Sequence, residues 1–388
     1  MARAESKMMK TCLPPPIHIN PPLLNSANPW ATTQEDLRAL FDCPSTGAVT
    51  TRTALLRGFA HDSARHRYAF FDAGIYAVGT TSGSGTVPSE STGDKSVGVG
   101  VGVGVGVSAN ASLNNMGYSP VPLDEYLGFI EAIVTGNRNR EKEKEKGREK
   151  GKAIEKLFIV SVTGTPEDVA ECYKRIVALG AKIGAPLAME INLSCPNIPG
   201  APPPAYSAEG LISYLHAVAR TATEEGSRCR EPVPWGVKTP PYTHAGQFDM
   251  LVDALRGELL GPGGPCPASF VAATNTLGSC LLLDGGNGPA LGGEMGGIGG
   301  MAGAPLHPLA LGNVATLRRM FDAFPETSHV QIIGVGGVED AAGYRRMRDV
   351  GAAVVGVGTA LGRKGVEVFG EIEDGLRSLS GDGEGAVW

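Results

Sequence analysis

The chain alternates short apolar runs rich in β-branched residues with longer stretches whose apolar residues recur at helical spacing. Each short run has the length and composition of a buried strand, and each longer stretch has the period of an amphipathic helix. A chain that repeats this unit about eight times closes its parallel strands into a barrel. The sequence therefore predicts an α/β fold, a (β/α)8 TIM barrel, with strands at 48–51, 157–162, 187–193, 235–238, 270–274, 330–335, 352–357 and near Ser112.

Helix signals separate these runs. Thr165 is suited to an N-cap, Pro166 to the first helical position, and the acidic residues 167 and 168 to the first turn. Val169, Cys172, Ile176 and Val177 follow at helical spacing. Similar helices are expected at 210–221, 248–260, 310–324 and 340–350.

Polar residues and glycines follow most of the predicted strands. The carboxyl ends of barrel strands meet at one rim, where barrels of this class carry their active sites. One pocket can therefore draw on residues that are far apart in the chain, namely Thr51, Arg52, Thr53, Asn114, Thr163, Gly164, Asn192, Cys195, Lys238, Asn275, Thr276, Gly336, Gly337, Gly358 and Thr359.

Cys195 is the candidate catalytic residue of this rim. It lies in the turn Asn-Leu-Ser-Cys-Pro-Asn-Ile-Pro-Gly, residues 192–200, directly after an apolar strand. A thiol with an ordinary pKa of about 8.5 can act as a general base near neutral pH, and the carboxamides of Asn192 and Asn197 can bind a polar substrate without adding charge. A lone cysteine is more often an inert buried thiol, but its place after a barrel strand favours catalysis.

The last two strands lead into glycine-rich turns, Gly334-Val-Gly-Gly337 and Gly356-Val-Gly358. Glycines at such positions expose backbone N–H groups to a phosphate, although tight strand-to-helix packing would also explain them. Lys238 ends an apolar strand and is followed by two prolines, so its ammonium is expected in the barrel mouth rather than in solvent. A buried lysine requires an anionic partner, and the electron-rich edge of a reduced flavin is one.

Composition bounds the partners of the chain. A net charge of −6 gives no electrostatic reason to expect nucleic acid or an anionic membrane. The seven cysteines form no Cys-x-x-Cys pair, which argues against zinc, iron–sulfur and disulfide frameworks. There is no apolar run of about 18 residues and no signal-peptide pattern at the start. We expect a cytoplasmic protein that acts on a small molecule and binds no metal.

Two segments read as insertions into a single domain that spans residues 13–378. Residues 80–108 contain an alternating Gly-Val tract, and no Lys-Ser/Thr pair follows it, so a loop is expected rather than a phosphate-binding loop. Residues 137–153 mix Lys and Arg with Glu, which predicts a solvated loop rather than a nucleic-acid contact. Residues 1–12 and 379–388 are expected to be disordered tails.

Taken together, the motifs resemble those of the class 1 dihydroorotate dehydrogenases, and most closely the class 1A branch that uses fumarate. The resemblance runs from about residue 20 to 361, with gaps at the two insertions. It rests on the cysteine turn and on four further motifs, Ser112-Leu-Asn-Asn-Met-Gly117, Gly236-Val-Lys-Thr-Pro-Pro241, Gly296-Gly-Ile-Gly-Gly300 and Gly334-Val-Gly-Gly337.

The resemblance implies FMN as the cofactor, a homodimer, and oxidation of dihydroorotate to orotate in pyrimidine biosynthesis, with fumarate as acceptor. Cys195 would remove the C5 proton while C6 delivers hydride to flavin N5. The substrate-binding residues would be Asn114, Met116, Gly117, Tyr118, Asn192, Asn197, Asn275 and Thr276. The cofactor-binding residues would be Ala27, Arg52, Thr53, Asn192, Lys238, Thr274, Gly297, Gly336, Gly337, Gly358 and Thr359.

Two loops depart from the family pattern. Thr51-Arg52-Thr53 stands where the family has Thr-Lys-Ser, and Asn25-Ser-Ala-Asn28 stands where it has Asn-Ala-Ser-Gly. Arginine offers a planar fork that can grip a carboxylate through two bonds, so it is not equivalent to lysine. Two alternatives therefore stay open: an FMN enzyme for another cyclic amide or unsaturated acid, and a catalytically silent flavin-binding barrel.

Overall fold

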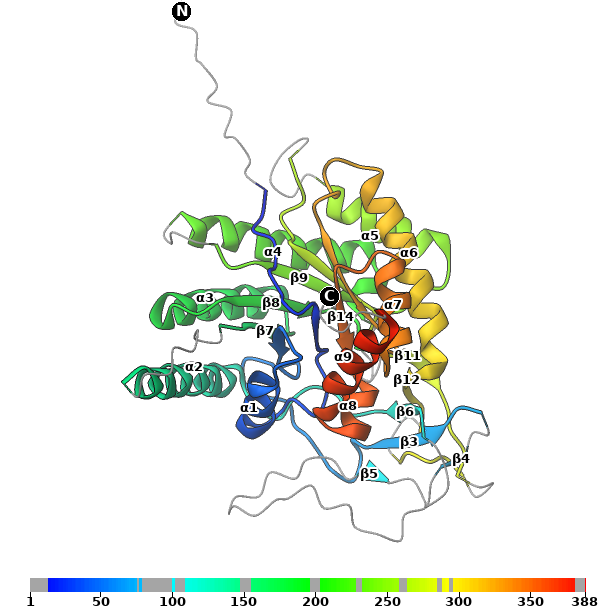
Figure 1. Cartoon of the computed structure of the whole chain (residues 1–388). Coiled ribbons are helices and arrows are strands. Elements are labelled where there is room, and N and C mark those ends of the chain that lie inside the picture. Colours follow the sequence, from blue (N-terminus) through cyan, green and yellow to red (C-terminus); the bar gives the residue numbers. More distant parts are fainter. Residues whose placement is uncertain are drawn as a thin grey trace, which may run out of the picture.

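The computed structural model describes residues 13–74, 77–78, 100–101, 109–146, 155–195, 203–227, 232–257, 264–284, 288–292, 296–380 and 388. Eight parallel strands form a closed barrel with helices around it (Figure 1). In order around the barrel these strands are β1 (Leu23–Asn25), β14 (Val354–Val357), β13 (Gln331–Val335), β10 (Phe270–Ala273), β9 (Trp235–Thr239), β8 (Leu187–Asn192), β7 (Leu157–Val162) and β2 (Ala48–Thr50). The predicted barrel fold is confirmed.

Two layers of apolar side chains explain why these runs fold as barrel strands. One layer fills the barrel interior with residues from most of its strands, among them Leu24, Ile159, Phe270 and Ile333. The other lies between the strands and the surrounding helices. Parallel strands buried on both faces read as nearly continuous apolar runs, which is the pattern of β7 and β10.

The helices lie close to where the sequence placed them. Thr165 caps α3 through the backbone N–H of Asp168, and the Asp168 carboxylate accepts from the Thr165 N–H in return. The helices are α1 (Gln34–Asp42), α2 (Leu123–Lys146), α3 (Pro166–Ile183), α4 (Ala208–Gly226), α5 (Ala245–Arg256), α6 (His307–Asp322), α7 (Ala341–Asp349), α8 (Thr359–Lys364) and α9 (Glu367–Ser380), with short 3-10 turns at Pro204–Tyr206 and Ala304–Leu306.

A second sheet lies beside the barrel mouth. Its order is β11 (Leu277–Cys280), β12 (Gly299–Gly303), β6 (Ala111–Asn114), β3 (Tyr68–Asp72) and β4 (Ala77–Val78), and β5 (Gly100–Val101) also pairs with β3. A hydrogen bond of 2.9 Å between the hydroxyls of Ser112 and Thr359 joins β6 to the start of α8. The strand predicted near Ser112 therefore exists, but it belongs to this sheet.

The eighth barrel strand is β1 instead, which the sequence analysis missed. β1 has only three residues, and Pro21 and Pro22 precede it. Its backbone pairs with β14 from Leu23 to Asn25 and with β2 at Leu24. A strand this short shows no recognisable period, and neighbouring prolines usually indicate a loop.

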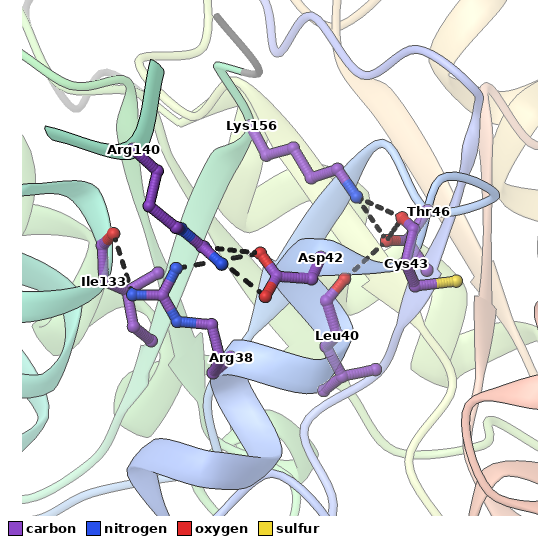
Figure 2. Close-up of polar contacts among 8 residues, drawn as sticks. All are labelled: Arg38, Leu40, Asp42, Cys43, Thr46, Ile133, Arg140 and Lys156. Atoms are coloured by element: carbon purple, nitrogen blue, oxygen red, sulfur yellow. Dashed lines mark hydrogen bonds and ion pairs between the residues drawn. The ribbon is translucent and has the colours of Figure 1, made fainter. Parts of the chain in front are cut away.

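The charged segment from residue 137 is helical as far as Lys146, so the predicted loop is wrong over 137–146. Arg138 donates to the carbonyls of Ile183 and Gly184 at the end of α3. Figure 2 shows Arg140 paired with Asp42 of α1 at 3.1 Å. Glu, Lys and Arg are good helix formers, so this composition continues α2.

The chain end departs from expectation in a similar way. Leu379 and Ser380 are the last residues of α9, and the Trp388 ring lies 5.5 Å from the Tyr344 ring. A disordered tail is therefore wrong for these three residues. The predicted tail 1–12 and all of the Gly-Val insertion except 100–101 lie outside the described residues. Among the helices that the structure describes, none is both long and apolar enough to cross a membrane.

Candidate active site

A cavity opens at the carboxyl ends of the barrel strands, with the second sheet forming part of its wall. Its empty space, including the part open to solvent, is about 1100 Å³. Nearly all of the predicted site residues line it, from both the barrel and the second sheet. They are Ala27, Arg52, Thr53, Asn114, Met116, Gly117, Tyr118, Asn192, Cys195, Lys238, Thr274, Asn275, Thr276, Gly336, Gly337, Gly358 and Thr359.

Cys195 lies half-buried in the cavity wall, three residues beyond the end of β8. The Tyr118 side chain lies close enough to Cys195 and Thr163 for both to influence its pKa. Burial raises the pKa of Tyr118 far above its ordinary value, and the neighbouring Cys195 raises it further. The phenol therefore keeps its proton and can donate a hydrogen bond toward the thiol.

Arg52 supplies a buried positive charge close to the same thiol. Its side chain is almost fully buried, and Nη2 donates to the carbonyl of Tyr118 at 3.0 Å. Burial lowers the pKa of Arg52 to about 10, while the nearby Tyr126 and Cys195 oppose that shift. The guanidinium therefore stays charged at neutral pH, where it favours the thiolate form of Cys195 and attracts an anion.

Two carboxamides in the wall have defined orientations. Asn192 Oδ1 accepts from the Ser194 backbone N–H (3.2 Å), the Ser194 hydroxyl (3.1 Å) and Asn275 Nδ2 (3.3 Å). Asn192 Nδ2 donates one hydrogen to Thr53 Oγ1 at 2.9 Å. Asn275 Nδ2 also donates to Ser194 Oγ at 3.0 Å, and Asn275 Oδ1 accepts from the Thr276 N–H at 2.8 Å.

This bonding pattern determines what each amide can offer a ligand. A carbonyl oxygen has two lone pairs and an amide nitrogen has two hydrogens. Asn192 has used its oxygen and keeps one N–H, so it offers a donor to the cavity. Asn275 has used both hydrogens and keeps a lone pair on Oδ1, so it offers an acceptor.

The other part of the wall suits an anionic, phosphate-bearing cofactor. Lys238 is only 3% exposed, and its ammonium has one long contact, 3.4 Å to the Ala27 carbonyl. The buried hydroxyl of Thr274 has no hydrogen-bond partner among the described residues. Gly337 has a φ of +69°, and a Cβ there would come within 2.7 Å of the Gly303 carbonyl. No side chain caps α8 after Gly358, so its first N–H groups can bind a phosphate.

Comparison with known protein families decides the identity of the fold. A model of the family "Dihydroorotate dehydrogenase" matches residues 104–379. The chain belongs to the dihydroorotate dehydrogenase family. Dihydroorotate dehydrogenase A (fumarate) of Lactococcus lactis is 29% identical over 270 residues, which is 69% of this chain and 73% of that protein.

Further relatives of this dihydroorotate dehydrogenase family member agree. Dihydroorotate dehydrogenase (fumarate) of Trypanosoma cruzi is 28% identical over 270 residues, covering 69% of this chain and 73% of that protein. The crystal structure of a ligand-free dihydroorotate dehydrogenase from Eimeria tenella superposes with a TM-score of 0.60 at 18% identity. It covers 93% of this chain and 85% of that one, so the likeness extends to the whole fold.

The lining residues do not include two of the predicted site residues, for different reasons. Asn197 lies outside the described residues. Gly297 is described but is not among the residues that line the cavity, and a Cβ there would lie 2.3 Å from Pro289 Cβ and 2.5 Å from the Leu291 carbonyl. Within this dihydroorotate dehydrogenase fold Gly297 therefore serves close packing against the 288–292 segment. The predicted place of Gly297 at the flavin stays a prediction.

The sequence analysis also missed several members of the wall. Trp30 lines the cavity and stacks on Phe70, with ring centroids 5.6 Å apart. Asn28, which departs from the family pattern, accepts from the Trp30 N–H at 2.9 Å and donates to the Ser26 carbonyl at 2.7 Å. Asn28 thus stabilises the turn that presents Trp30. In the sequence, the Asn-Pro-Trp run at residues 28–30 was the only signal for a turn that presents Trp30 to the cavity.

Proposed function

We propose that this chain catalyses the FMN-dependent oxidation of (S)-dihydroorotate to orotate, a step of pyrimidine biosynthesis. The observation that carries the proposal is the meeting of the Cys195 thiol, an amide donor–acceptor pair and the buried Lys238 in one cavity. Membership of the dihydroorotate dehydrogenase family supports the same reaction. The relatives named above as fumarate enzymes support fumarate as the acceptor.

FMN fits the residues of the cavity. The orphaned Thr274 hydroxyl and the poorly satisfied Lys238 ammonium need partners, which a flavin ring can supply. Backbone N–H groups of Gly336, Gly337 and Thr359 would hold the phosphate. Bound FMN supplies an acceptor for the hydride, with its two electrons, that leaves C6 of the substrate.

Residues of the protein remove the C5 proton of the substrate. The Cys195 thiolate takes the proton from C5, so the C5–H pair becomes the second bond of the new C5=C6 double bond as hydride departs from C6. Tyr118 keeps its proton and can donate a hydrogen bond toward the sulfur, which would help to hold the thiolate in place. The charge of Arg52 favours the thiolate before the transfer, which raises the fraction of enzyme ready to react.

The carboxamides favour a cyclic amide as substrate. An adjacent C=O and N–H on a ligand ring would accept from Asn192 Nδ2 and donate to Asn275 Oδ1. A dihydropyrimidine ring carries such edges. A ligand with two acceptors at this edge would leave the Asn275 oxygen facing another lone pair, which is costly in a buried site.

An anaerobic half-reaction tests this proposal. We expect dihydroorotate to bleach the flavin band of the purified yellow protein and fumarate to restore it. Cys195→Ala should slow the bleaching at least about 100-fold because the general base is gone, while its orotate affinity should change little. A protein purified without flavin, or a Cys195→Ala variant reduced as fast as the wild type, would contradict the proposal.

Arg52 supports a second candidate, oxidation of a different cyclic amide or unsaturated acid. Its buried guanidinium has a single side-chain bond to a backbone carbonyl, so it retains donors for a carboxylate. Comparing dihydroorotate with dihydrouracil, which lacks the carboxylate, separates the candidates. Faster turnover of dihydrouracil would favour the second, and a strong preference for dihydroorotate would favour the first.

The remaining features of the proposal rest on the resemblance. We propose a single FMN-binding domain over residues 13–378, a homodimer and a cytoplasmic location. Size-exclusion chromatography with light scattering tests the dimer, and a tagged chain followed by microscopy tests the location.

A further inference from the structure

Glu190 is a buried carboxylate to which the proposed mechanism assigns no role. It projects into the barrel interior from β8 and is only 3% exposed. Among the described residues its one hydrogen bond is from the hydroxyl of Ser161, its neighbour on β7, at 2.8 Å. It forms no ion pair within the described part of the chain. Keeping such a group costs stability, so a compensating role is expected.

A chain of hydrogen bonds connects Glu190 to the cavity. The Ser161 hydroxyl lies 3.0 Å from the Thr53 hydroxyl, and Thr53 Oγ1 accepts from Asn192 Nδ2 at 2.9 Å. Both Thr53 and Asn192 line the cavity, whereas Glu190 and Ser161 lie behind its wall. The chain therefore links a buried carboxyl group to a proposed substrate contact.

The two ends of the chain allow only one direction of donation. At one end the Ser194 backbone N–H can only donate, so Asn192 must turn its oxygen toward Ser194 and its nitrogen toward Thr53. At the other end the Ser161 hydroxyl donates its hydrogen to Glu190 Oε1. The Thr53 hydroxyl must then donate to Ser161, and its oxygen is left to accept from Asn192.

We propose that Glu190 is a positioning residue that, through Ser161, holds the Thr53 hydroxyl turned away from the cavity and so keeps the second N–H of Asn192 available to the substrate. The inference rests on the proposed function only for the identity of the ligand. Without an acceptor at residue 190, Ser161 can donate to Thr53 instead. The Thr53 oxygen then receives two donors, or its own hydrogen turns into the cavity.

The test compares three variants of the FMN-loaded protein by calorimetric titration with orotate. Glu190→Gln keeps an oxygen that accepts from Ser161, so its orotate Kd should stay within about threefold of wild type. Glu190→Leu removes the acceptor and should weaken binding about tenfold. Ser161→Ala interrupts the chain one step nearer the cavity and should give a similar loss, and it serves if the leucine variant does not fold.

Non-additivity and kinetics separate positioning from general damage. The double variant Glu190→Leu, Ser161→Ala should bind orotate no more weakly than the worse single variant, because both remove one linkage. In the half-reaction the Kd for dihydroorotate should rise while the limiting reduction rate stays within about twofold. The proposal would be overturned if Glu190→Leu and Ser161→Ala both bound orotate as tightly as the wild type. It would also be overturned if their losses of affinity added up in the double variant, or if Glu190→Gln already showed the full loss.

The same titrations distinguish failure of the inference from failure of the proposed function. A wild-type protein that binds orotate but is not reduced by dihydroorotate would contradict the proposed function. The orotate Kd values of the variants would still test the positioning role of Glu190. A wild-type protein that binds no orotate would overturn both.

Discussion

Two buried lysines lie at opposite ends of the barrel, and their surroundings differ. Lys238 is at the carboxyl end of β9 and has one contact of 3.4 Å, whereas Lys156 precedes β7 at the amino end. Lys156 donates to the Cys43 carbonyl and, at 3.0 Å, to the Thr46 hydroxyl (Figure 2). The protein itself satisfies one ammonium and leaves the other for a ligand. Unmet hydrogen bonds, rather than burial, are therefore the reason for proposing Lys238 as the lysine that contacts the cofactor.

The largest effect is expected from Lys238→Met. We expect loss of bound FMN and a fall in kcat/KM of more than about 100-fold, because the cavity loses its buried cation near the flavin. The unfolding midpoint of the flavin-free protein should be equal to or above that of the flavin-free wild type, since an unsatisfied buried charge has been removed. Flavin content and thermal unfolding measure the two effects. Normal flavin content in the Lys238→Met variant would contradict the proposal that Lys238, unlike Lys156, contacts the cofactor.

A smaller effect is expected from Lys156→Met, and it should depend on pH. Burial lowers the pKa of Lys156 to about 8, below its usual value of 10.5. Between these values the unfolded chain binds more protons, so wild-type stability should rise with pH by on the order of 1 to 2 kcal/mol. The variant should lack this rise and keep its flavin. Denaturant unfolding of both proteins between pH 7 and 10 measures this rise. An equal pH dependence of stability in the variant and the wild type would contradict the assignment of the rise to Lys156.

The smallest effect is expected from Asp42→Asn. The Asp42 carboxylate raises the pKa of Lys156 against the effect of burial and pairs with Arg140 at the surface. Removing its charge should move the start of the pH-dependent rise down by less than about one pH unit. The stability loss at pH 7 should stay under about 1 kcal/mol, because exposed ion pairs contribute little. A loss of several kcal/mol would contradict this expectation. It would show that the contacts of Arg38, Asp42 and Arg140 between α1 and α2 contribute much more stability than an exposed ion pair (Figure 2).

Sequence reasoning succeeded where one local pattern determines one element. Continuous apolar runs identified strands such as β7 and β8, and the Thr165-Pro166 signal identified the start of α3. It failed for β1 because three residues after two prolines carry no period. It also failed at 137–146, where the mixed charge of the segment suggested a loop. The structure shows a helix there, and Arg138 and Arg140 of this helix contact α3 and α1.

The candidate site was predictable as a set of residues but not as a set of bonds. Cys195, Lys238 and most of their predicted neighbours line one cavity because barrel strands share a rim. The link from Glu190 to Ser161 depends on the pairing register of β7 and β8, which spacing along the chain does not reveal. The packing role of Gly297 likewise depends on a segment that folds back against it.

The antiparallel pairing of β3 with β6 has a consequence for protein engineering. Because Phe71 pairs with Ala111, the segment between β3 and β6, which contributes β4 and β5 to the same sheet, begins and ends at adjacent positions. The entropic cost of lengthening a segment between such anchored ends rises only slowly with its length. A fluorescent domain or affinity tag could therefore be inserted between β3 and β6 while the barrel and its cavity keep their geometry.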